Sequence, residues 1–268
     1  MLRSKYTQSL RLLFQNHCLL CTLPLGGTGQ RRLLMPNSNR KSALAKSHFI
    51  LCAECRTDWL GGHKQVRWRC QRCKVAVLGD GESLHLDCMS CRDRPLALAQ
   101  LAVAFDYAAP VDSLVWRLKS FGQFRLAPVL AELMLEVLRA DSWVLPADTW
   151  VVAIPSRRQA LCKRGFNPAA ELGRYVAQGL GLHWAPSAIA LAQPAHAQAQ
   201  KHRTQNQRWQ YAQRAFQWCS TATPKTLLVI DDVLTTGSTL HGAALCAQAH
   251  GVHQVYGLAL ARTPWLNE

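Results

Sequence analysis

Eight of the eleven cysteines form four C-x-x-C pairs, and all four pairs lie in the first third of the chain. They are Cys18/Cys21, Cys52/Cys55, Cys70/Cys73 and Cys88/Cys91. The two-residue spacing lets both thiolates of a pair reach one tetrahedral zinc ion, and two pairs complete a closed four-sulfur site. Pairing neighbours gives C-x2-C-x30-C-x2-C followed by C-x2-C-x14-C-x2-C, and the second spacing is close to that of a zinc ribbon. We predict two structural Zn²⁺ sites.

Other interpretations of these cysteines stay open at this point. The pairs can alternate in a cross-braced arrangement, and four-cysteine sites also support iron–sulfur clusters. Disulfides are disfavoured because the first residues, MLRSKYTQSLRLLFQNH, make a poor secretory signal. Closed thiolate sites leave no coordination position for a substrate, so they serve to fold a segment with a thin core. Cys162, Cys219 and Cys246 stand alone and are expected to be ordinary core residues.

The charge of the chain is strongly positive and unevenly distributed. The chain has a formal net charge of +15, and residues 1–95 hold 16 basic and 6 acidic residues. Much of the excess lies in residues 26–47, a polar segment with glycine and serine that we expect to be an exposed loop. Such loops are often only solubilising, but the asymmetry favours a polyanionic partner. No apolar run is long enough to span a membrane, and we expect a cytoplasmic protein.

After Pro95 the cysteine pairs end and apolar segments alternate between strand and helix patterns. Strands are expected within 96–107, at 150–155 and at 227–230, and helices within 110–122 and at 126–140, 169–181 and 241–251. This alternation predicts an α/β fold whose mainly parallel sheet has helices on both faces. We therefore divide the chain into a double zinc-ribbon module at 1–95 and an α/β domain at 96–268.

The stretch LLVIDDVLTTGSTL at 227–240 predicts a binding site. Four apolar residues suit a buried strand, and the acidic pair Asp231 and Asp232 is expected at its end. The turn that follows contains Thr235, Thr236, Gly237, Ser238 and Thr239. Unpaired backbone N–H groups at the start of the next helix attract an anion such as phosphate. The acidic pair suits neighbouring hydroxyl groups or a divalent cation, and the simpler alternative is an N-cap cluster after a core strand.

A second candidate segment reads IPSRRQALCKRGFN, at 154–167. We interpret it as a loop that follows a strand and carries four cations, Arg157, Arg158, Lys163 and Arg164. In open α/β sheets, ligands bind outside the carboxyl ends of the strands, so these cations are placed to bind pyrophosphate. A solvated basic loop would explain the charges but not the ordered RGFN ending.

The motif VIDDVLTTGST resembles the phosphoribosyl pyrophosphate (PRPP) motif of type I phosphoribosyltransferases. The resemblance implies that Asp231 and Asp232 contact the ribose hydroxyls and that the turn from Thr235 to Thr239 holds the 5′-phosphate. The chain is also similar to the ComF (GntX-like) family. The similarity rests on the four cysteine pairs, on Arg164-Gly165-Phe166-Asn167, and on a loose match to L-K-F-G at Leu118, Lys119, Phe121 and Gly122. The similarity covers nearly the whole chain and implies a type I phosphoribosyltransferase-like fold for residues 96–268.

The segment 192–216 departs from the ComF pattern. Aligned on Ala215-Phe216, it matches the family at Gln200 and Arg208, but Arg203 falls at the leucine and Tyr211 stands where the family has asparagine. It is rich in alanine and glutamine, and we expect a mobile flap over the site. Tyr211 puts catalytic competence in question.

Two functions follow from the resemblance. In the first, the chain binds PRPP or a nucleotide-like ligand with Mg²⁺ and acts in natural competence, where it handles single-stranded DNA and meets other competence proteins. The single-stranded DNA would then be contacted by five basic residues and one tryptophan: Arg31, Arg32, Arg40, Lys41, Lys46 and Trp68. In the second, it is an active phosphoribosyltransferase in which Asp231, Asp232, Lys163 and Arg164 are catalytic residues, and the basic segment stabilises the leaving pyrophosphate.

Overall fold

A computed structural model describes residues 69–77, 87–93, 95–124, 126–192 and 214–264, with parts of 18–24, 52–57 and 209–212. It divides the chain into two compact units, Met1–Arg67 and Trp68–Glu268. The first four-cysteine group lies in the smaller unit, and the second lies in the larger unit with the α/β sheet. The predicted division at residues 95 and 96 stays a prediction.

Thirteen helices and strands are resolved in the described part of the chain. In order they are α3 (Met89–Asp93), β1 (Gln100–Asp106), α4 (Val111–Phe121), α5 (Leu126–Ala140), β2 (Trp150–Ala153), α6 (Arg158–Arg164), α7 (Pro168–Leu180), β3 (His183–Trp184), β4 (Ile189–Leu191), β5 (Phe216–Trp218), β6 (Thr226–Leu234), α9 (Ser238–Ala249) and β7 (Gln254–Arg262). All of them belong to the larger unit.

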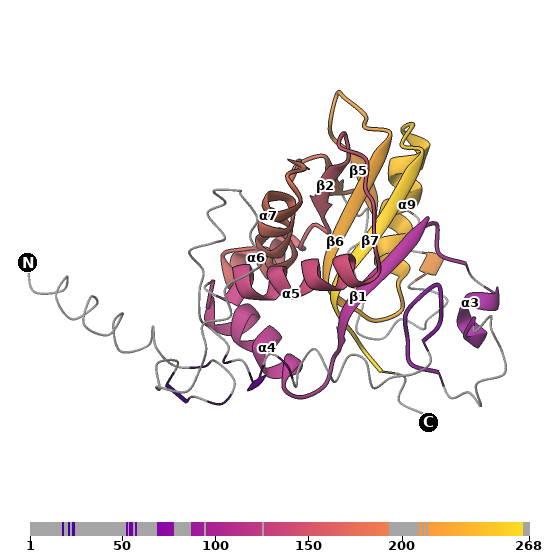
Figure 1. Cartoon of the computed structure of the whole chain (residues 1–268). Helices are drawn as coiled ribbons and strands as arrows, with labels where there is room; N and C mark the ends of the chain where they lie inside the picture. The colour runs from indigo at the N-terminus through magenta and orange to yellow at the C-terminus, as the bar shows by residue number, and fades with distance from the viewer. Residues whose placement is uncertain are drawn as a thin grey trace, which may run out of the picture. The chain divides into compact units, whose positions relative to one another are not determined.

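Five strands form one sheet in the order β1-β7-β6-β2-β3, and every neighbouring pair in it is parallel. Strand β6 lies at the centre, between β7 and β2 (Figure 1). The antiparallel strands β4 and β5 form a separate two-stranded sheet. The predicted α/β class with a mainly parallel sheet is therefore confirmed.

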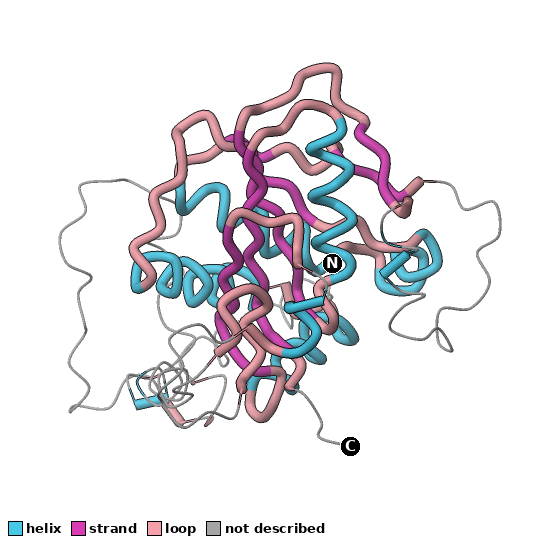
Figure 2. The backbone as a smooth tube through the Cα atoms, turned by 90° about the vertical axis from the view of Figure 1, so that its right-hand side faces the viewer, coloured by secondary structure: helices cyan, strands magenta, loops and turns pink. Residues whose placement is uncertain are grey.

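Helices cover both faces of the sheet (Figures 1 and 2). Helices α5 and α7 pack against each other, α5 on β1 and β7 and α7 on β2 and β6, whereas α9 packs on β6 and β7. The apolar run of β6 serves both layers because side chains alternate along a strand. Leu227 and Val229 belong to the cluster that contains Leu240 of α9, and Ile230 faces Gly173 of α7. This double burial is why the run is continuously apolar.

The observed boundaries differ from the predicted ones at two functional segments. Strand β6 does not end before the acidic pair but continues through it to Leu234, because residues 231–234 keep pairing with β7. The basic segment is not a loop: residues 158–164 form helix α6. Helix α5 begins and ends at the predicted residues. The short strands β3, β4 and β5 were not predicted, because two or three residues carry no readable periodicity.

Candidate functional site

The candidate site lies at the carboxyl edge of the sheet, where the connections after β2 and β6 diverge. Strand β2 continues through α6 and α7 to β3, whereas β6 continues through α9 to β7 on the other side of the β2–β6 pair. A crevice forms where neighbouring parallel strands lead in opposite directions, and ligands of open α/β sheets bind in it. The Ile154 N–H donates to the Ile230 carbonyl over 2.9 Å, so the segment after β2 lies beside the acidic pair of β6.

The two carboxylates of the acidic pair have different surroundings. Asp231 is 9% exposed, and its Oδ1 accepts a hydrogen bond from the Asp232 N–H over 2.8 Å. Burial raises the pKa of the Asp231 carboxyl to about 8, and the negative charge of Asp232 adds to the rise. Asp232 is more open, and its Oδ2 lies 3.0 Å from the Lys119 Nζ. The pair therefore offers one carboxylate that is paired with a lysine and one carboxyl that holds its proton near neutral pH.

Lys119 brings helix α4 into the site. It lies in the last turn of α4, which ends at Gly122 in the left-handed conformation. The sequence match marked Lys119 as part of a motif but did not identify its partner. Its ion pair with Asp232 joins that motif to the acidic pair, which is 113 residues further along the chain.

The predicted phosphate turn is a compact structure at the start of α9. Thr235 to Gly237 connect β6 to α9, and Gly237 has a φ of +80°. The hydroxyls of Thr236 and Ser238 are 2.9 Å apart, and the Ser238 N–H donates to the Thr236 Oγ1 over 3.3 Å. Thr239 lies inside the first turn of α9. The turn has the hydroxyl groups and the helix N-terminus that an anion site requires.

The four predicted cations lie on α6 or at its start, and all four are exposed. Gly165 ends this helix in the left-handed conformation, with its N–H donating to the Leu161 carbonyl. Asn167 caps α7, and its side chain also binds the Ser156 hydroxyl and the Ile154 carbonyl, at 2.9 and 2.8 Å. The RGFN ending therefore shapes the segment next to Asp231 and Asp232.

The rings of Phe124 and Phe166 tie this segment to the end of α4. Their centroids are 4.7 Å apart in an edge-to-face contact. Because Phe166 directly follows Gly165 and Phe124 follows Gly122, the two sequence motifs that flank the site are in contact with each other. The acidic pair, the hydroxyl turn, Lys119 and the Ser156–Asn167 segment therefore surround one edge of the sheet.

The eight paired cysteines form two four-sulfur groups, in the neighbour pairing given above rather than the cross-braced one. Within each group, the sulfur atoms all lie within 4.8 Å of one another. The first group contains Cys18, Cys21, Cys52 and Cys55, and the second contains Cys70, Cys73, Cys88 and Cys91. Each group is a complete set of soft ligands with the separation that a tetrahedral Zn²⁺ requires, so these residues could hold the two predicted ions.

Backbone donors in both groups point at sulfur, as expected for thiolate ligands. The Cys55 N–H donates to the Cys52 Sγ over 3.4 Å, and the Cys73 and Cys88 N–H groups donate to the Cys70 Sγ. Burial raises the pKa of the Cys88 thiol to about 11, and the neighbouring Cys73 adds to it. A divalent metal would replace the protons of these thiols, which is why metal binding and folding are coupled in such sites.

Two arginines connect the second group to the sheet through contacts that the sequence did not predict. Arg69 makes a bidentate pair with Asp106 at the end of β1, at 2.9 and 2.8 Å, and donates to the Lys74 carbonyl. Arg262, at the end of β7, is 3% exposed and donates to the Cys73 carbonyl over 3.1 Å. Isolated arginines carry no sequence signal for such contacts, since each pairs with a residue that is distant in the chain.

Several predicted features lie outside the described residues. These are the basic loop with Arg31, Arg32, Arg40, Lys41 and Lys46, the residue Trp68, and most of the expected flap, including Tyr211. At the end of that flap segment, Trp209 stacks on His241 of α9 with a centroid distance of 4.4 Å. Of the lone cysteines, Cys246 is buried as expected, but Cys162 and Cys219 are exposed, so the core prediction is wrong for them.

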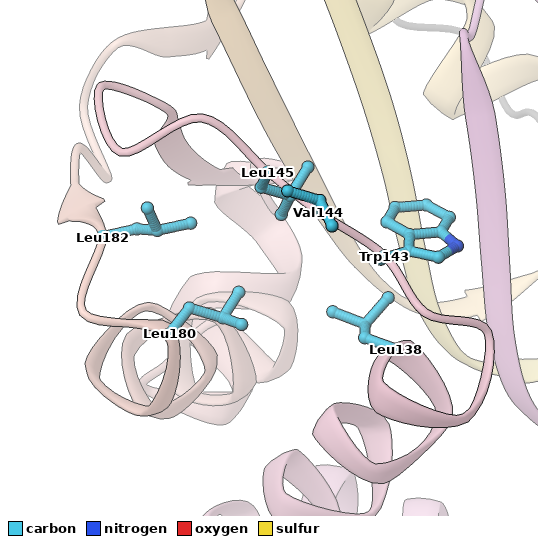
Figure 3. A pocket seen from close by; sticks show the side chains of 6 residues that line it. All are labelled: Leu138, Trp143, Val144, Leu145, Leu180 and Leu182. Atoms are coloured by element: carbon cyan, nitrogen blue, oxygen red, sulfur yellow. The ribbon is translucent and has the colours of Figure 1, made fainter.

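An apolar pocket of about 260 Å³ lies near the last residues of α5 and α7 (Figure 3). Its lining comes from the ends of α5 and α7 and the segments after them: Leu138, Trp143, Val144, Leu145, Leu180 and Leu182. Helix α7 starts at the carboxyl edge of the sheet, so its last residues lie toward the opposite edge. This pocket has no charged group for a phosphate.

The fold and the site define a class: an α/β protein with a parallel sheet, an acidic strand followed by a hydroxyl turn, and two four-cysteine groups. The chain is 30% identical to DNA utilization protein YhgH of Salmonella typhi over 222 residues, covering 82% of this chain and 93% of the relative. It is 27% identical to the protein of the same name from Escherichia coli K12, with the same coverage. The chain therefore belongs to the ComF family, which includes YhgH.

More distant similarities add little. Competence protein F of Haemophilus influenzae is 24% identical over 181 residues, which cover 65% of this chain and 78% of that protein. No model of a protein family matches the chain. The crystal structure of TT1426 from Thermus thermophilus shares 13% identity and covers 53% of this chain and 85% of that one, with a TM-score of 0.31. A likeness this low carries no argument.

Proposed function

We propose that the chain binds PRPP or a nucleotide-like ligand at the carboxyl edge of β6 and acts in the handling of single-stranded DNA. The observation that carries the proposal is the acidic pair followed by a hydroxyl turn and a helix N-terminus, at the point where parallel connections diverge. The names of the relatives, DNA utilization protein and competence protein, support the DNA part of the proposal. Within the described residues, no helix has the length and apolar character needed to cross a membrane.

Each part of the site suits one part of the ligand. The N–H groups and hydroxyls of Thr236 and Ser238 would bind the 5′-phosphate at the start of α9. Asp231 and Asp232 would accept hydrogen bonds from the ribose hydroxyls. Mg²⁺, held by carboxylate and phosphate oxygens, would neutralise part of the diphosphate charge. The exposed cations of α6 lie on the neighbouring connection, where the pyrophosphate end would extend.

Lys119 supports this assignment through its effect on charge. Two carboxylates without a cation would repel a phosphate ligand. The Lys119 ammonium, 3.0 Å from the Asp232 carboxylate, offsets one of these charges. Asp231 holds a proton near neutral pH, so the unliganded site is less negative than its sequence suggests. A polyanion can therefore approach it.

The second candidate function is phosphoribosyl transfer to a nucleobase or related acceptor. In that reaction the bond between ribose C1 and the pyrophosphate oxygen breaks, the pyrophosphate leaves with the electron pair, and an acceptor nitrogen forms the new bond to C1. The cations of α6, Lys163 and Arg164 among them, would stabilise the charge of the leaving group. These cations are exposed in the unliganded chain, so this function requires that the bound ligand shields them from water.

One experiment separates binding from transfer. PRPP is titrated calorimetrically into the full chain with and without Mg²⁺, and pyrophosphate release is then measured with PRPP, Mg²⁺ and a panel of bases. Binding without release supports the first function, and base-dependent release supports the second. Asp232→Asn is the matched variant, because it keeps the size of the side chain and removes one charge. Absence of PRPP binding to the wild-type chain at millimolar concentration would refute the second function and the PRPP part of the first, and absence of binding of a nucleoside monophosphate as well would refute the first.

The proposed contact with single-stranded DNA has support in the described residues. Trp116 and Phe121 on α4 are 55% and 61% exposed, and Phe124 is 49% exposed. Trp116 packs edge-to-face on Phe121, and Phe124 contacts Phe166 beside the basic helix α6. Exposed rings next to cations are the combination that binds single strands by stacking and charge.

We expect single-stranded DNA to bind more tightly than duplex DNA. The slope of log affinity against log salt should be roughly −0.7 for each phosphate contact. Replacing Trp116 and Phe121 by alanine tests the stacking surface, and replacing the five cations at positions 31, 32, 40, 41 and 46 tests the basic loop. Unchanged affinity in one variant removes that surface from the proposal, and no binding at low salt removes the DNA contact altogether.

A further inference from the structure

Arg262 is a buried cation that contacts both the second four-cysteine group and the hydroxyl turn. Its Nε donates to the Cys73 carbonyl over 3.1 Å, and its Nη2 lies 4.0 Å from the Cys73 Sγ. Its Nη1 donates to the carbonyls of Leu234, Thr235 and Thr263. Leu234 ends β6 and Thr235 begins the turn, so one guanidinium joins the cysteine group to the candidate phosphate site.

The charge of Arg262 requires a counter-charge. A buried guanidinium is stable only when it is paired and hydrogen-bonded. In the described part of the chain, no carboxylate pairs with Arg262, because Asp106, its register partner on β1, is taken by Arg69. Four thiolates around one divalent ion carry a net charge of about −2. The Cys73 Sγ, 4.0 Å from the Arg262 Nη2, belongs to the group that would carry this charge when it holds a metal.

The hydrogen bonds of Arg262 also orient the peptide groups of the turn. In a planar trans peptide, the N–H points away from the carbonyl of the same group. The Leu234 and Thr235 carbonyls point toward Arg262, so the N–H groups of Thr235 and Thr236 point away from it. The Thr236 N–H is one of the donors proposed above for the phosphate. Displacing the guanidinium would remove the contact that holds the Thr235 carbonyl and would leave the Leu234 carbonyl held by the Thr263 N–H.

Leu96 makes a second connection between the same two regions. It packs against the cluster of Cys70, Cys73, Val75 and Cys91. On its other side it lies so close to Gly237 that a Cβ at that position would be 2.9 Å from the Leu96 Cδ2. A shift of the cysteine group would therefore reach the turn through Leu96 as well as through Arg262.

We propose that metal loading of the second four-cysteine group sets the conformation of the turn through Arg262, so that Zn²⁺ in this group and a phosphate ligand at the turn strengthen each other's binding. Arg262 is a positioning residue in this scheme. The proposal rests on the proposed function for the identity of the ligand, but the link between metal group and turn does not. Coupling of this kind is reciprocal: if Zn²⁺ tightens PRPP binding, PRPP tightens Zn²⁺ binding by the same factor.

The first test measures the reciprocal effect. A chelating dye extracts Zn²⁺ from the Cys52→Ser chain, in which metal is confined to the second group, with and without PRPP. At equilibrium, we expect PRPP to tighten Zn²⁺ binding against the dye about fivefold or more. Arg262→Met should abolish this protection, and Arg262→Lys should restore part of it by returning the charge. Arg139→Met is the matched control, since Arg139 is an exposed arginine paired with Glu132 on α5.

The second test needs no ligand and uses amide hydrogen exchange. The Thr263 N–H donates to the Leu234 carbonyl and the His241 N–H to the Gly237 carbonyl, each over 2.9 Å. In Cys88→Ser, which lacks one ligand of the group, both amides should exchange about tenfold faster. The Leu182 amide, bonded to the Ala177 carbonyl at the end of α7, should not change. Its protection also shows that the sheet domain is still folded.

The outcomes separate this proposal from the proposed function. If the chain does not bind PRPP, but Cys88→Ser speeds exchange at Thr263 and His241, PRPP binding is refuted and the link between the metal group and the turn is supported. The coupling is overturned if PRPP binds and protects zinc equally with and without Arg262→Met, while the turn amides exchange at the same rate in wild type and Cys88→Ser. Faster exchange at Leu182 as well would show that Cys88→Ser unfolds the sheet domain. The coupling is then tested by the zinc measurement alone, in which PRPP should protect zinc in Arg262→Lys but not in Arg262→Met.

Discussion

The turn after β6 and the helix after β2 lie at the same edge of the sheet, but the protein builds them differently. Residues of the turn are bonded to each other and to Arg262, and Ser238 is 7% exposed. Helix α6 has no buried residue, and its cations form no ion pair within the described residues. The conformation of the turn is therefore fixed before any ligand binds. In α6 the helix fixes the backbone of the cations, but no ion pair in the described part of the chain fixes their side chains.

Two glycines allow this contrast to be measured. Gly237 in the turn and Gly165 after α6 both have a φ of +80°, so both are strained by any side chain. An added Cβ at Gly165 meets nothing within 4 Å, whereas at Gly237 it meets Leu96. Alanine at either glycine strains the backbone, but only alanine at Gly237 also collides with a neighbouring side chain. Comparing the two variants therefore separates the cost of backbone strain from the cost of packing.

The largest effect is expected from Gly237→Ala. Backbone strain should lower the free energy of unfolding by about 1–2 kcal/mol at either glycine. At Gly237 the displacement of Leu96 should add about 1–3 kcal/mol. Chemical denaturation measures both, and calorimetry should show weakened PRPP binding in Gly237→Ala alone. Combining Gly237→Ala with Leu96→Ala should recover part of the packing loss. Equal destabilisation by Gly237→Ala and Gly165→Ala would show that the turn is no more tightly built than α6.

The next effect concerns Asp231 and pH. Its pKa is raised to about 8 in the folded chain, so the folded state holds a proton that the unfolded state has lost. The contribution of Asp231 to stability is therefore full below pH 4 and falls as the pH rises toward 8. Asp231→Asn should raise the free energy of unfolding at pH 8 and remove this dependence. Denaturation midpoints at pH 5, 7 and 8.5 measure it.

Ligand binding should show the opposite pH dependence at the same residue. If ribose hydroxyls or Mg²⁺ bind the ionised carboxylate, PRPP affinity falls as the pH drops below about 8, by up to tenfold per pH unit. Calorimetry in buffers with different ionisation enthalpies should detect proton release on binding. Asp231→Asn should weaken binding and abolish the release. PRPP binding without proton release at pH 7 would mean that Asp231 does not take part.

The parts of this molecule that the sequence predicted are those with local patterns. The amphipathic period predicted the limits of α5, and the C-x-x-C spacing identified both cysteine groups, because each pattern is contained in a short stretch. The end of β6 was predicted too early, since two aspartates suggest a loop. In the structure the strand continues because β7 extends far enough to pair with residues 231–234. Tertiary pairing overrides the local preference there.

The partners of individual side chains could not be predicted from the sequence, for a different reason. Lys119 pairs with Asp232 only because α4, which follows β1, reaches the carboxyl end of β6. Arg262 contacts carbonyls on both sides only because the sheet order places β7 next to β6. Such contacts depend on strand order, which no single segment encodes. The family pattern marked Lys119 without explaining it. Nothing marked Arg262, although it touches both the metal group and the turn.

The smallest effects are expected from the cations of α6. Each is exposed, and an exposed charge that is not fixed by the protein contributes about 0.2–1 kcal/mol to an interaction in water. Arg158→Ala and Lys163→Ala should therefore each weaken PRPP binding only about two- to fivefold. The loss should shrink as salt is raised, because exposed charges are screened. Arg174→Ala, which removes an exposed cation of α7 that pairs with Glu171, is the control and should have no effect on PRPP binding. A hundredfold loss from either α6 variant that persists at high salt would mean that the ligand draws α6 into a closed, desolvated site. The difference between a turn with a fixed conformation and a helix with exposed cations would then hold only for the unliganded chain.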